Sequence, residues 1–160
     1  DQVQDKAQLT LLRETIKTDK EINILIAKSL IKKGFKKIGV LGLSYKGDLK
    51  VSILSPVIPF VKELLKNNIH VEIYDPFFSA EEINKILGIK VFKFPQNILN
   101  FDCIVVTVDH NKFKINHNIL KRYLKKCKFI LDNNGIWKNY NLNNSKLTYC
   151  MAGDKNWLQF

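Results

Sequence analysis

The sequence predicts an α/β fold, a doubly wound parallel sheet of five or six strands preceded by a long helical segment. Short apolar runs rich in β-branched residues alternate along the chain with amphipathic segments of helical period. Strands that alternate with helices need right-handed crossovers and therefore lie parallel. The run at residues 101–108 is apolar almost throughout, as expected for a strand covered on both faces. These observations predict a Rossmann-like sandwich.

The first elements follow from periodicity and from end signals. Residues 9–30 carry apolar side chains at helical spacing, and Gly34 is placed to end the helix, which predicts one long helix or two in series. Residues 37–43 predict the first strand. After a long loop, Ser55 is a candidate N-cap and Pro56 takes the first position of the next helix.

The strand and helix pattern then repeats. Residues 70–76 predict a strand stopped by Pro76, and Ser79 with Glu82 three residues later forms a capping box that begins a helix. The remaining expected elements are a short strand around Val91 and Phe92, a strand at 101–108, a helix at 116–127, a strand at 128–133 and a short last strand at 146–151.

Composition bounds the class of protein. The 160 residues are 46% hydrophobic and 26% charged, which fits one ordered domain. No apolar run approaches the ~18 residues of a membrane span, and the first residues resemble no secretory leader, so we expect a cytoplasmic protein without a membrane segment. The widely spaced Cys103, Cys127 and Cys150 are expected to be reduced core residues, with neither a catalytic thiol nor a metal site among them.

The net charge of +11 favours anionic ligands. The lysines are scattered, partly in pairs such as Lys32 and Lys33, instead of forming one basic block. No nucleic-acid-binding motif accompanies them, so nucleic acid is not favoured as a partner. Scattered lysines usually mark solvated faces, although a positive field also attracts phosphate-bearing ligands.

The strongest candidate site is the loop after the first predicted strand. Residues 42–48 read GLSYKGD, where Gly42 allows a tight exit from the strand and Lys46 can offer a point charge to a phosphate. The dinucleotide fingerprint G-x-G-x-x-G is absent, and the loop from Gly42 to Ser55 is too long for the standard phosphate turn. An ordinary surface lysine is the alternative reading of Lys46.

Three further residues have a functional and a structural interpretation. Asp75 ends the second strand, where an acid can bind a ribose, but Pro76 favours a turn and capping role. His110 follows Asp109 at the end of the fourth strand, and a loop hydrogen bond is favoured over a catalytic dyad. Trp137 is expected in the core or at a domain interface.

Several ordered segments resemble the carboxy-terminal UDP-binding domain of the UDP-glucose/GDP-mannose dehydrogenase family. They are GVLGLSYKGD (39–48), LSP (54–56), VEIYDP (71–76), TVDHNKFK (107–114) and DNNGIW (132–137). The resemblance covers roughly residues 36–150. Residues 1–34 are similar to the end of the family's central helix region, which builds the dimer, so we expect a UDP-binding Rossmann-like domain over residues 35–160.

The resemblance implies a role in an NAD-dependent oxidation of the C6 hydroxymethyl of a nucleotide sugar to a carboxylate, which passes through a thiohemiacetal on a cysteine. That cysteine motif and the amino-terminal NAD-binding fingerprint have no counterpart in this sequence, so no catalytic residue is assigned and the chain alone is expected to be inactive. The implied UDP-sugar contacts are Tyr45, Lys46 and the backbone of Ser44, with Ser55 as a cofactor contact. The implied partners are the amino-terminal domain and a second copy of the chain.

Two departures from the family pattern bear on the ligand. Ile53 stands where an arginine helps to bind the NAD pyrophosphate, and Asn134 stands where many members direct an arginine at the substrate. The GIW ending resembles the branch acting on N-acetylated sugars, which favours UDP-N-acetylmannosamine over UDP-glucose or UDP-N-acetylglucosamine. A non-catalytic, degenerate nucleotide-binding or dimerisation module is the alternative, and a basic nucleic-acid-binding domain is a weaker one.

Overall fold

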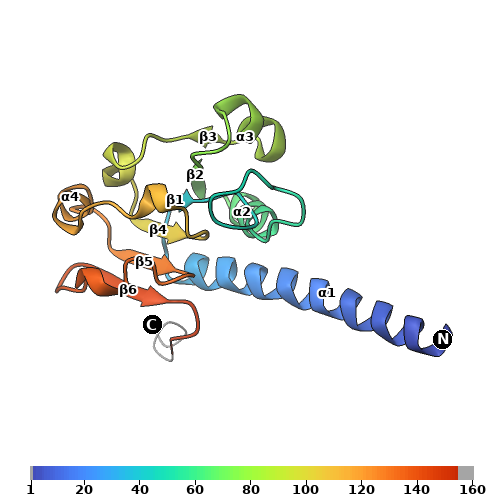
Figure 1. Ribbon diagram of the computed structural model, residues 1–160. Coiled ribbons are helices and arrows are strands. Elements are labelled where there is room, and N and C mark those ends of the chain that lie inside the picture. Colours follow the sequence, from blue (N-terminus) through green and yellow to red (C-terminus); the bar gives the residue numbers. More distant parts are fainter. Residues whose placement is uncertain (1, 155–160) are drawn as a thin grey trace.

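The computed structural model describes residues 2–154, with side chains for residue 10 and residues 13–154. Its described part contains a parallel sheet in the order β3-β2-β1-β4-β5-β6, in which every neighbouring pair runs parallel (Figure 1). The strands are β1 Lys37–Leu41, β2 His70–Tyr74, β3 Lys90–Val91, β4 Cys103–Val106, β5 Phe129–Asp132 and β6 Thr148–Met151. The predicted doubly wound parallel sheet is confirmed, with six strands.

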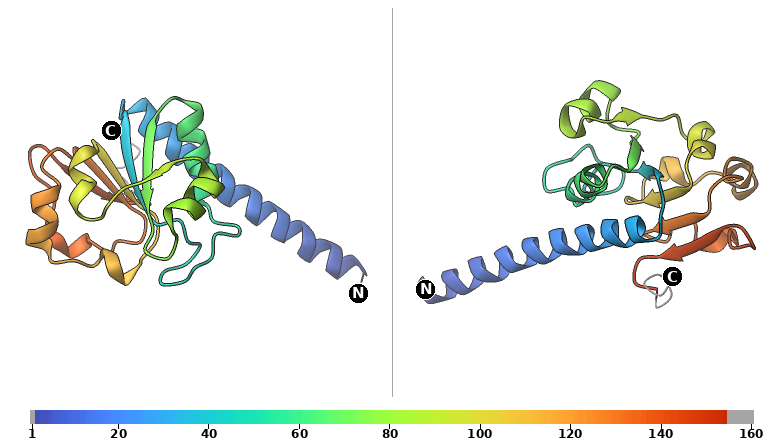
Figure 2. Two further views of the ribbon diagram at one scale, coloured as in Figure 1. Left: turned by 90° about the horizontal axis from the view of Figure 1, so that it is seen from above. Right: turned by 180° about the vertical axis from the view of Figure 1, so that it is seen from behind.

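Helices cover both faces of this sheet (Figure 2). The α-helices are α1 Gln2–Lys32, α2 Val57–Lys66, α3 Ala80–Leu87 and α4 His117–Tyr123, and the short 3₁₀ helices are η1 Gln96–Asn100, η2 Asn111–Phe113 and η3 Lys138–Tyr140. The connections β3 to β4 and β5 to β6 contain η1 and η3 instead of α-helices. These 3₁₀ helices were not predicted from the sequence.

Two apolar cores lie on opposite sides of the sheet. Cys103 and Val105 of β4 belong to the core under α1, α2 and α3, whereas Ile104 and Val106 belong to the core under η1 and α4. This alternation follows from the two-residue period of a strand. It explains why β4 is apolar at every position, since neither face of the strand is exposed.

The long helix α1 is continuous, and only its carboxy-terminal part packs on the sheet. Ile26, Ala27 and Leu30 are buried in the first core, while the amino-terminal part of α1 extends beyond the sheet (Figures 1 and 2). Gly34 has a φ of +84°, which fits the predicted helix end. None of the helices in residues 2–154 is long and apolar enough to cross a membrane.

The predicted start of α3 is confirmed, whereas α2 begins one residue later than predicted, at Val57 with Pro56 as its N-cap. The Ser55 hydroxyl accepts a hydrogen bond from the Val57 N–H at 3.2 Å, and Pro56 already has helical dihedral angles. Ser79 and Glu82 make both hydrogen bonds of the capping box that begins α3. The loop that precedes α2 therefore ends at a fixed point.

The cysteines are free and buried, as predicted. Burial raises the pKa of Cys127 to about 12, and burial also raises the pKa of Cys103. Both thiols therefore stay protonated near neutral pH, which suits a packing role.

Replacement of Leu30 by alanine tests the packing of α1. Leu30 is fully buried, so Leu30→Ala should lower the free energy of unfolding by about 3 kcal/mol, measured by urea denaturation. Leu49→Ala makes the same chemical change at a half-exposed position and should stay within about 0.5 kcal/mol of the wild type. Equal effects of the two variants would contradict the packing of α1 described here.

Candidate functional site

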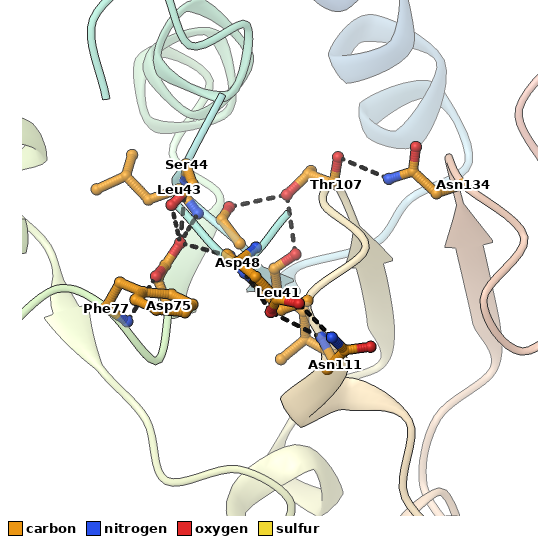
Figure 3. Close-up of polar contacts among 11 residues, drawn as sticks. Leu41, Leu43, Ser44, Asp48, Asp75, Phe77, Thr107, Asn111 and Asn134 are labelled. Carbon is orange, nitrogen blue, oxygen red and sulfur yellow. Dashed lines mark hydrogen bonds and ion pairs between the residues drawn. The ribbon is translucent and has the colours of Figure 1, made fainter. Parts of the chain in front are cut away.

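The candidate site lies where the carboxyl ends of β1, β2, β4 and β5 meet. The strand order reverses between β1 and β4, and ligands of doubly wound sheets bind outside the strand ends at this switch point. The loop between β1 and α2, residues 42–56, starts here (Figure 3). Asp75 follows β2, Thr107 follows β4, and Asp132 is the last residue of β5.

Asp75 holds the start of this loop. Its Oδ2 accepts hydrogen bonds from the Leu43 N–H at 2.7 Å, the Ser44 N–H at 3.0 Å and the Ser44 hydroxyl at 3.1 Å. Its Oδ1 accepts from the Phe77 N–H at 2.9 Å, so the predicted turn role of Asp75 is confirmed. The same carboxylate also fixes the backbone at the exit of β1 (Figure 3).

This carboxylate is charged although it is 2% exposed. Burial opposes ionisation, but hydrogen bonds from His110 and from the N–H groups of Leu43, Phe77 and Ser44 stabilise the anion and lower the pKa of Asp75 to about 2. The loop therefore starts on a fixed negative charge at neutral pH.

His110 is fully buried and joins Asp75 to the far end of the loop. Its Nδ1 accepts a hydrogen bond from the Asp48 N–H at 2.8 Å, so this nitrogen carries no proton. The proton is then on Nε2, which donates to Asp75 Oδ2 at 3.1 Å. The predicted loop hydrogen bond of His110 is confirmed, but its carboxylate partner is Asp75, which sequence reasoning missed.

Asp48 is the second anchor of the loop. It has a φ of +55°, and its carboxylate accepts hydrogen bonds from the Asn111 N–H at 3.0 Å and from the Asn111 side-chain amide. A Cβ at Gly47 would overlap the side chain of Asp109, so the loop lies directly on the segment after β4. The backbone of residues 43–48 is therefore fixed at both ends.

The predicted ligand contacts lie in different environments. Tyr45 is 62% exposed and Lys46 is also exposed, so both can reach a ligand. Ser44 is buried, and because its N–H already donates to Asp75, a backbone contact from Ser44 to a ligand falls to its carbonyl oxygen.

Asn134 is held at the same edge by Thr107. The Asn134 side-chain amide donates to the Thr107 carbonyl at 3.2 Å, and the Thr107 hydroxyl lies 2.9 Å from the Leu41 carbonyl and 2.8 Å from the Gly42 carbonyl (Figure 3). The structure thus brings Asn134 next to the exit of β1, although the two segments are far apart in the sequence.

Asp132 organises the segment that carries Asn134. This buried carboxylate accepts hydrogen bonds from the N–H groups of Asn134, Gly135 and Trp137 at 3.2, 2.8 and 2.9 Å, and from the Tyr149 hydroxyl at 2.9 Å. Burial and the neighbouring Asp132 raise the pKa of Tyr149, so its hydroxyl stays protonated. Sequence reasoning missed this cluster, although an acid at the end of a buried strand was a signal for it.

Trp137 belongs to the core. Its ring is fully buried, and Nε1 donates to the Phe113 carbonyl at 3.0 Å. The predicted core position of Trp137 is confirmed. No group of three or more metal-ligating side chains occurs among the residues whose side chains are described.

The second half of the loop exposes apolar side chains. Ile53 is 78% exposed, whereas Ser55, two residues later, is buried and its hydroxyl accepts a hydrogen bond from the Val57 N–H at the start of α2. We call these exposed side chains the apolar loop surface; they are Leu49, Val51, Ile53 and Leu54. Large exposed apolar groups gathered in one loop are typical of an interaction surface.

The strand order 3-2-1-4-5-6 and a long ordered loop at the switch point define a Rossmann-like α/β domain with a ligand-binding edge. Residues 39–139 match the model of the UDP-glucose/GDP-mannose dehydrogenase family, UDP binding domain. The chain belongs to this family, as the sequence analysis predicted.

Relatives and solved structures agree with this assignment. The chain is 30% identical over 156 residues to a UDP-N-acetyl-D-mannosamine dehydrogenase of Methanococcus aeolicus, covering 81% of this chain and 32% of the relative. It is 33% identical over 93 residues to a UDP-N-acetyl-D-glucosamine 6-dehydrogenase of Salmonella typhi, covering 56% and 22%. A solved UDP-D-ManNAc dehydrogenase of Pyrococcus horikoshii matches with a TM-score of 0.58 and 25% identity, over 79% of this chain and 28% of that one.

The alignments span a third or less of these relatives' own lengths, the largest share being 32%. The fold alone is shared with an NDP-N-acetyl-D-galactosaminuronic acid dehydrogenase of Methanosarcina mazei, with a TM-score of 0.65 and 20% identity over 87% of this chain and 30% of that one.

The pKa of Asp75 predicts a pH dependence of stability. Because the pKa is about 2 in the folded state and ~3.9 in an unfolded chain, the stabilisation is complete above about pH 5 and is lost as the pH falls towards 2. Asp75→Asn should lower the free energy of unfolding by about 2 kcal/mol at pH 6 and by about half as much at pH 3, measured by urea denaturation.

Asp19→Asn on the exposed face of α1 is the control and should match the wild type at both pH values. A wild-type to Asp75→Asn difference that is the same at pH 3 and pH 6 would show that the charge of Asp75 does not stabilise the fold.

Proposed function

We propose that this chain is the UDP-sugar-binding part of an NAD-dependent nucleotide-sugar 6-dehydrogenase, which oxidises the C6 hydroxymethyl of the sugar to a carboxylate. The observation that carries the proposal is the loop of residues 43–48, which is fixed at both ends and holds the exposed Lys46 at the switch point of the sheet. In this proposal residues 35–160 bind UDP and residues 1–34 belong to the central helix region. Residue 1 and residues 155–160 lie outside the described residues.

Each proposed substrate contact has a chemical role. Lys46 supplies a positive charge for the diphosphate, and the exposed ring of Tyr45 supplies an apolar face with a hydroxyl. Ser44 contributes its backbone carbonyl. Asn134, whose amide nitrogen is already engaged by Thr107, offers its Oδ1 to a hydroxyl or N-acetyl group of the sugar.

The cofactor NAD belongs mainly to the amino-terminal part of the enzyme in this proposal. The start of α2 does not fit a dinucleotide pyrophosphate, because the Val57 N–H donates to Ser55 and the exposed Ile53 offers no charge. Ser55 is therefore proposed to affect the cofactor only indirectly, by fixing the end of the loop that precedes α2. The chain alone is proposed to be inactive, since the nucleophilic cysteine is also assigned to the amino-terminal part.

UDP-N-acetylmannosamine is the favoured substrate. The relative from Methanococcus aeolicus carries that sugar in its name, and the relative from Salmonella typhi also carries an N-acetylated sugar. Synthesis of polysaccharide precursors is the proposed process. A cytoplasmic location is proposed because the free, buried cysteines suit a reducing compartment.

A non-catalytic binding or dimerisation module is the second candidate. The exposed Ile53 favours it, because an apolar side chain stands where the family directs an arginine at NAD. This candidate predicts weak or no UDP binding.

Two protein partners are part of the proposal. The apolar loop surface is proposed to contact the amino-terminal domain of the enzyme, since burial of such side chains is favourable. A second copy of the chain is proposed to pack on α1, where Ile16, Ile22 and Leu25 are about half exposed or more. Ile22 and Leu25 lie three residues apart, on a side of α1 turned away from the buried Ile26, Ala27 and Leu30, whereas Ile16 lies three helical turns before Ala27 on the core-facing side.

Replacement of Lys46 tests the nucleotide role. The wild type should bind UDP and UDP-N-acetylmannosamine saturably in calorimetric titrations at moderate salt, and Lys46→Ala should weaken binding about 30-fold, because a charge-assisted contact to phosphate is worth ~2 kcal/mol.

Lys62→Ala removes the same charge from the exposed surface of α2 and should leave the affinity unchanged. A similar loss in both variants would instead indicate binding to the overall positive charge, and absence of binding to the wild type would favour the non-catalytic module.

Substitutions on α1 test the dimer. Ile22→Glu with Leu25→Glu should convert a dimer to a monomer in sedimentation velocity, because two charges would be buried between the helices. Lys20→Glu, which is exposed and lies on the opposite side of α1 at 100° of helical turn per residue, should remain dimeric. A monomeric wild type, or dissociation caused equally by Lys20→Glu, would contradict an interface on this face of α1.

A further inference from the structure

We propose that His110 and Asp75 are a buried positioning pair that sets the conformation of the loop of residues 43–48 for a nucleoside diphosphate. This inference rests on the proposed function. It assigns ligand-related roles to two side chains that, being buried, do not themselves reach the ligand.

The pair joins three separate segments into one hydrogen-bonded unit. Asp75 follows β2 and accepts hydrogen bonds from the N–H groups of Leu43 and Ser44 at the start of the loop. His110 follows β4 and accepts a hydrogen bond from the N–H of Asp48 at the end of the loop. The bond between His110 Nε2 and Asp75 Oδ2 closes the unit beneath the loop, at 3.1 Å.

The candidate contacts Tyr45 and Lys46 lie between these two anchors. The Tyr45 N–H donates to the Val51 carbonyl at 2.6 Å, which ties the returning part of the loop to its start. The rings of Phe77 and Phe113 pack against the imidazole, with ring centroids 5.1 and 5.2 Å from its own, and this packing restricts its orientation. The pair is therefore rigid and reaches the ligand only through the loop backbone.

Side-chain packing holds only the start of this loop, where Leu43 is fully buried. Tyr45, Lys46 and Asp48 are exposed, so the conformation of the rest of the loop depends on the hydrogen bonds of its backbone. A buried carboxylate is costly unless it is fully paired, and an apolar pair would stabilise the fold as well. What the hydrogen-bonded pair adds is a fixed loop before the ligand arrives, which lowers the entropy cost of binding.

Two substitutions of His110 separate its two hydrogen bonds. The amide of His110→Gln reaches the position of Nε2, so this variant can keep the donor to Asp75 but loses the acceptor for the Asp48 N–H. The amide of His110→Asn reaches only the position of Nδ1, so this variant can keep the acceptor but loses the donor. His110→Gln should weaken UDP binding about tenfold, a loss of ~1.4 kcal/mol, and His110→Asn clearly less. Thermal stability should follow the other order, because His110→Asn removes a donor from a buried carboxylate.

A double-substitution cycle tests the route through Lys46. Because the pair is proposed to act by positioning Lys46, the effect of His110→Gln on the dissociation constant of UDP should largely disappear in the Lys46→Ala background. Amide hydrogen exchange gives a readout without ligand: the Asp48 N–H should exchange faster in His110→Gln than in the wild type and in His110→Asn.

The outcomes separate the two proposals. If the wild type binds UDP but His110→Gln binds it equally well, or if the two substitutions act additively, the positioning role is wrong and the proposed function stands. Affinities that fall in step with thermal stability in both His110 variants also contradict the inference, since they indicate a structural role alone. If the wild type does not bind UDP, the proposed function fails and the ligand role of the pair fails with it.

Discussion

The binding edge of this sheet depends on buried carboxylates that accept the backbone N–H groups of the loops. Asp75 binds the N–H groups at the exit of β1, and Asp132 binds those that follow β5. A chain that leaves a parallel sheet loses its ladder partners, and its buried N–H groups then need other acceptors. One carboxylate can accept several such bonds, and these bonds in turn stabilise the buried charge. Each aspartate thus fixes the loop that follows a strand, by accepting backbone N–H groups that the sheet leaves without a partner.

This arrangement separates the residues that shape the edge from those that can meet a ligand. Asp75, His110 and Asp132 are buried, whereas Tyr45 and Lys46 are exposed on backbone that the buried groups hold. Substitution of these exposed side chains should therefore leave the loop conformation unchanged. The buried groups tolerate less change, because removal of one partner leaves a charge or an N–H unsatisfied in the interior.

The sequence predicted elements whose signals are local. The capping box of Ser79 and the strand at β4 depend on residues close together in the chain, and both are confirmed. The turn at Asp75 was also predicted, but its bond to His110 was not, because the two residues are 35 positions apart and meet only since β2 and β4 flank β1. The 3₁₀ helices η1 and η3 escaped prediction because such short segments show no helical period.

The apolar loop surface bears on the proposed contact with an amino-terminal domain. Exposed Ile53 and Leu54 give this loop no packing of its own, yet Ser55 and Asp48 hold it in one conformation. Fixing an exposed apolar loop is unfavourable for an isolated domain, because the ordered chain loses entropy and gains no burial. The arrangement is favourable where a second surface covers the loop, because a loop that is already ordered loses little further conformational entropy when the contact forms. In the proposed function the same ordered loop presents Lys46 to the ligand and the apolar side chains to the amino-terminal domain, so ligand binding and domain contact would be coupled through one loop.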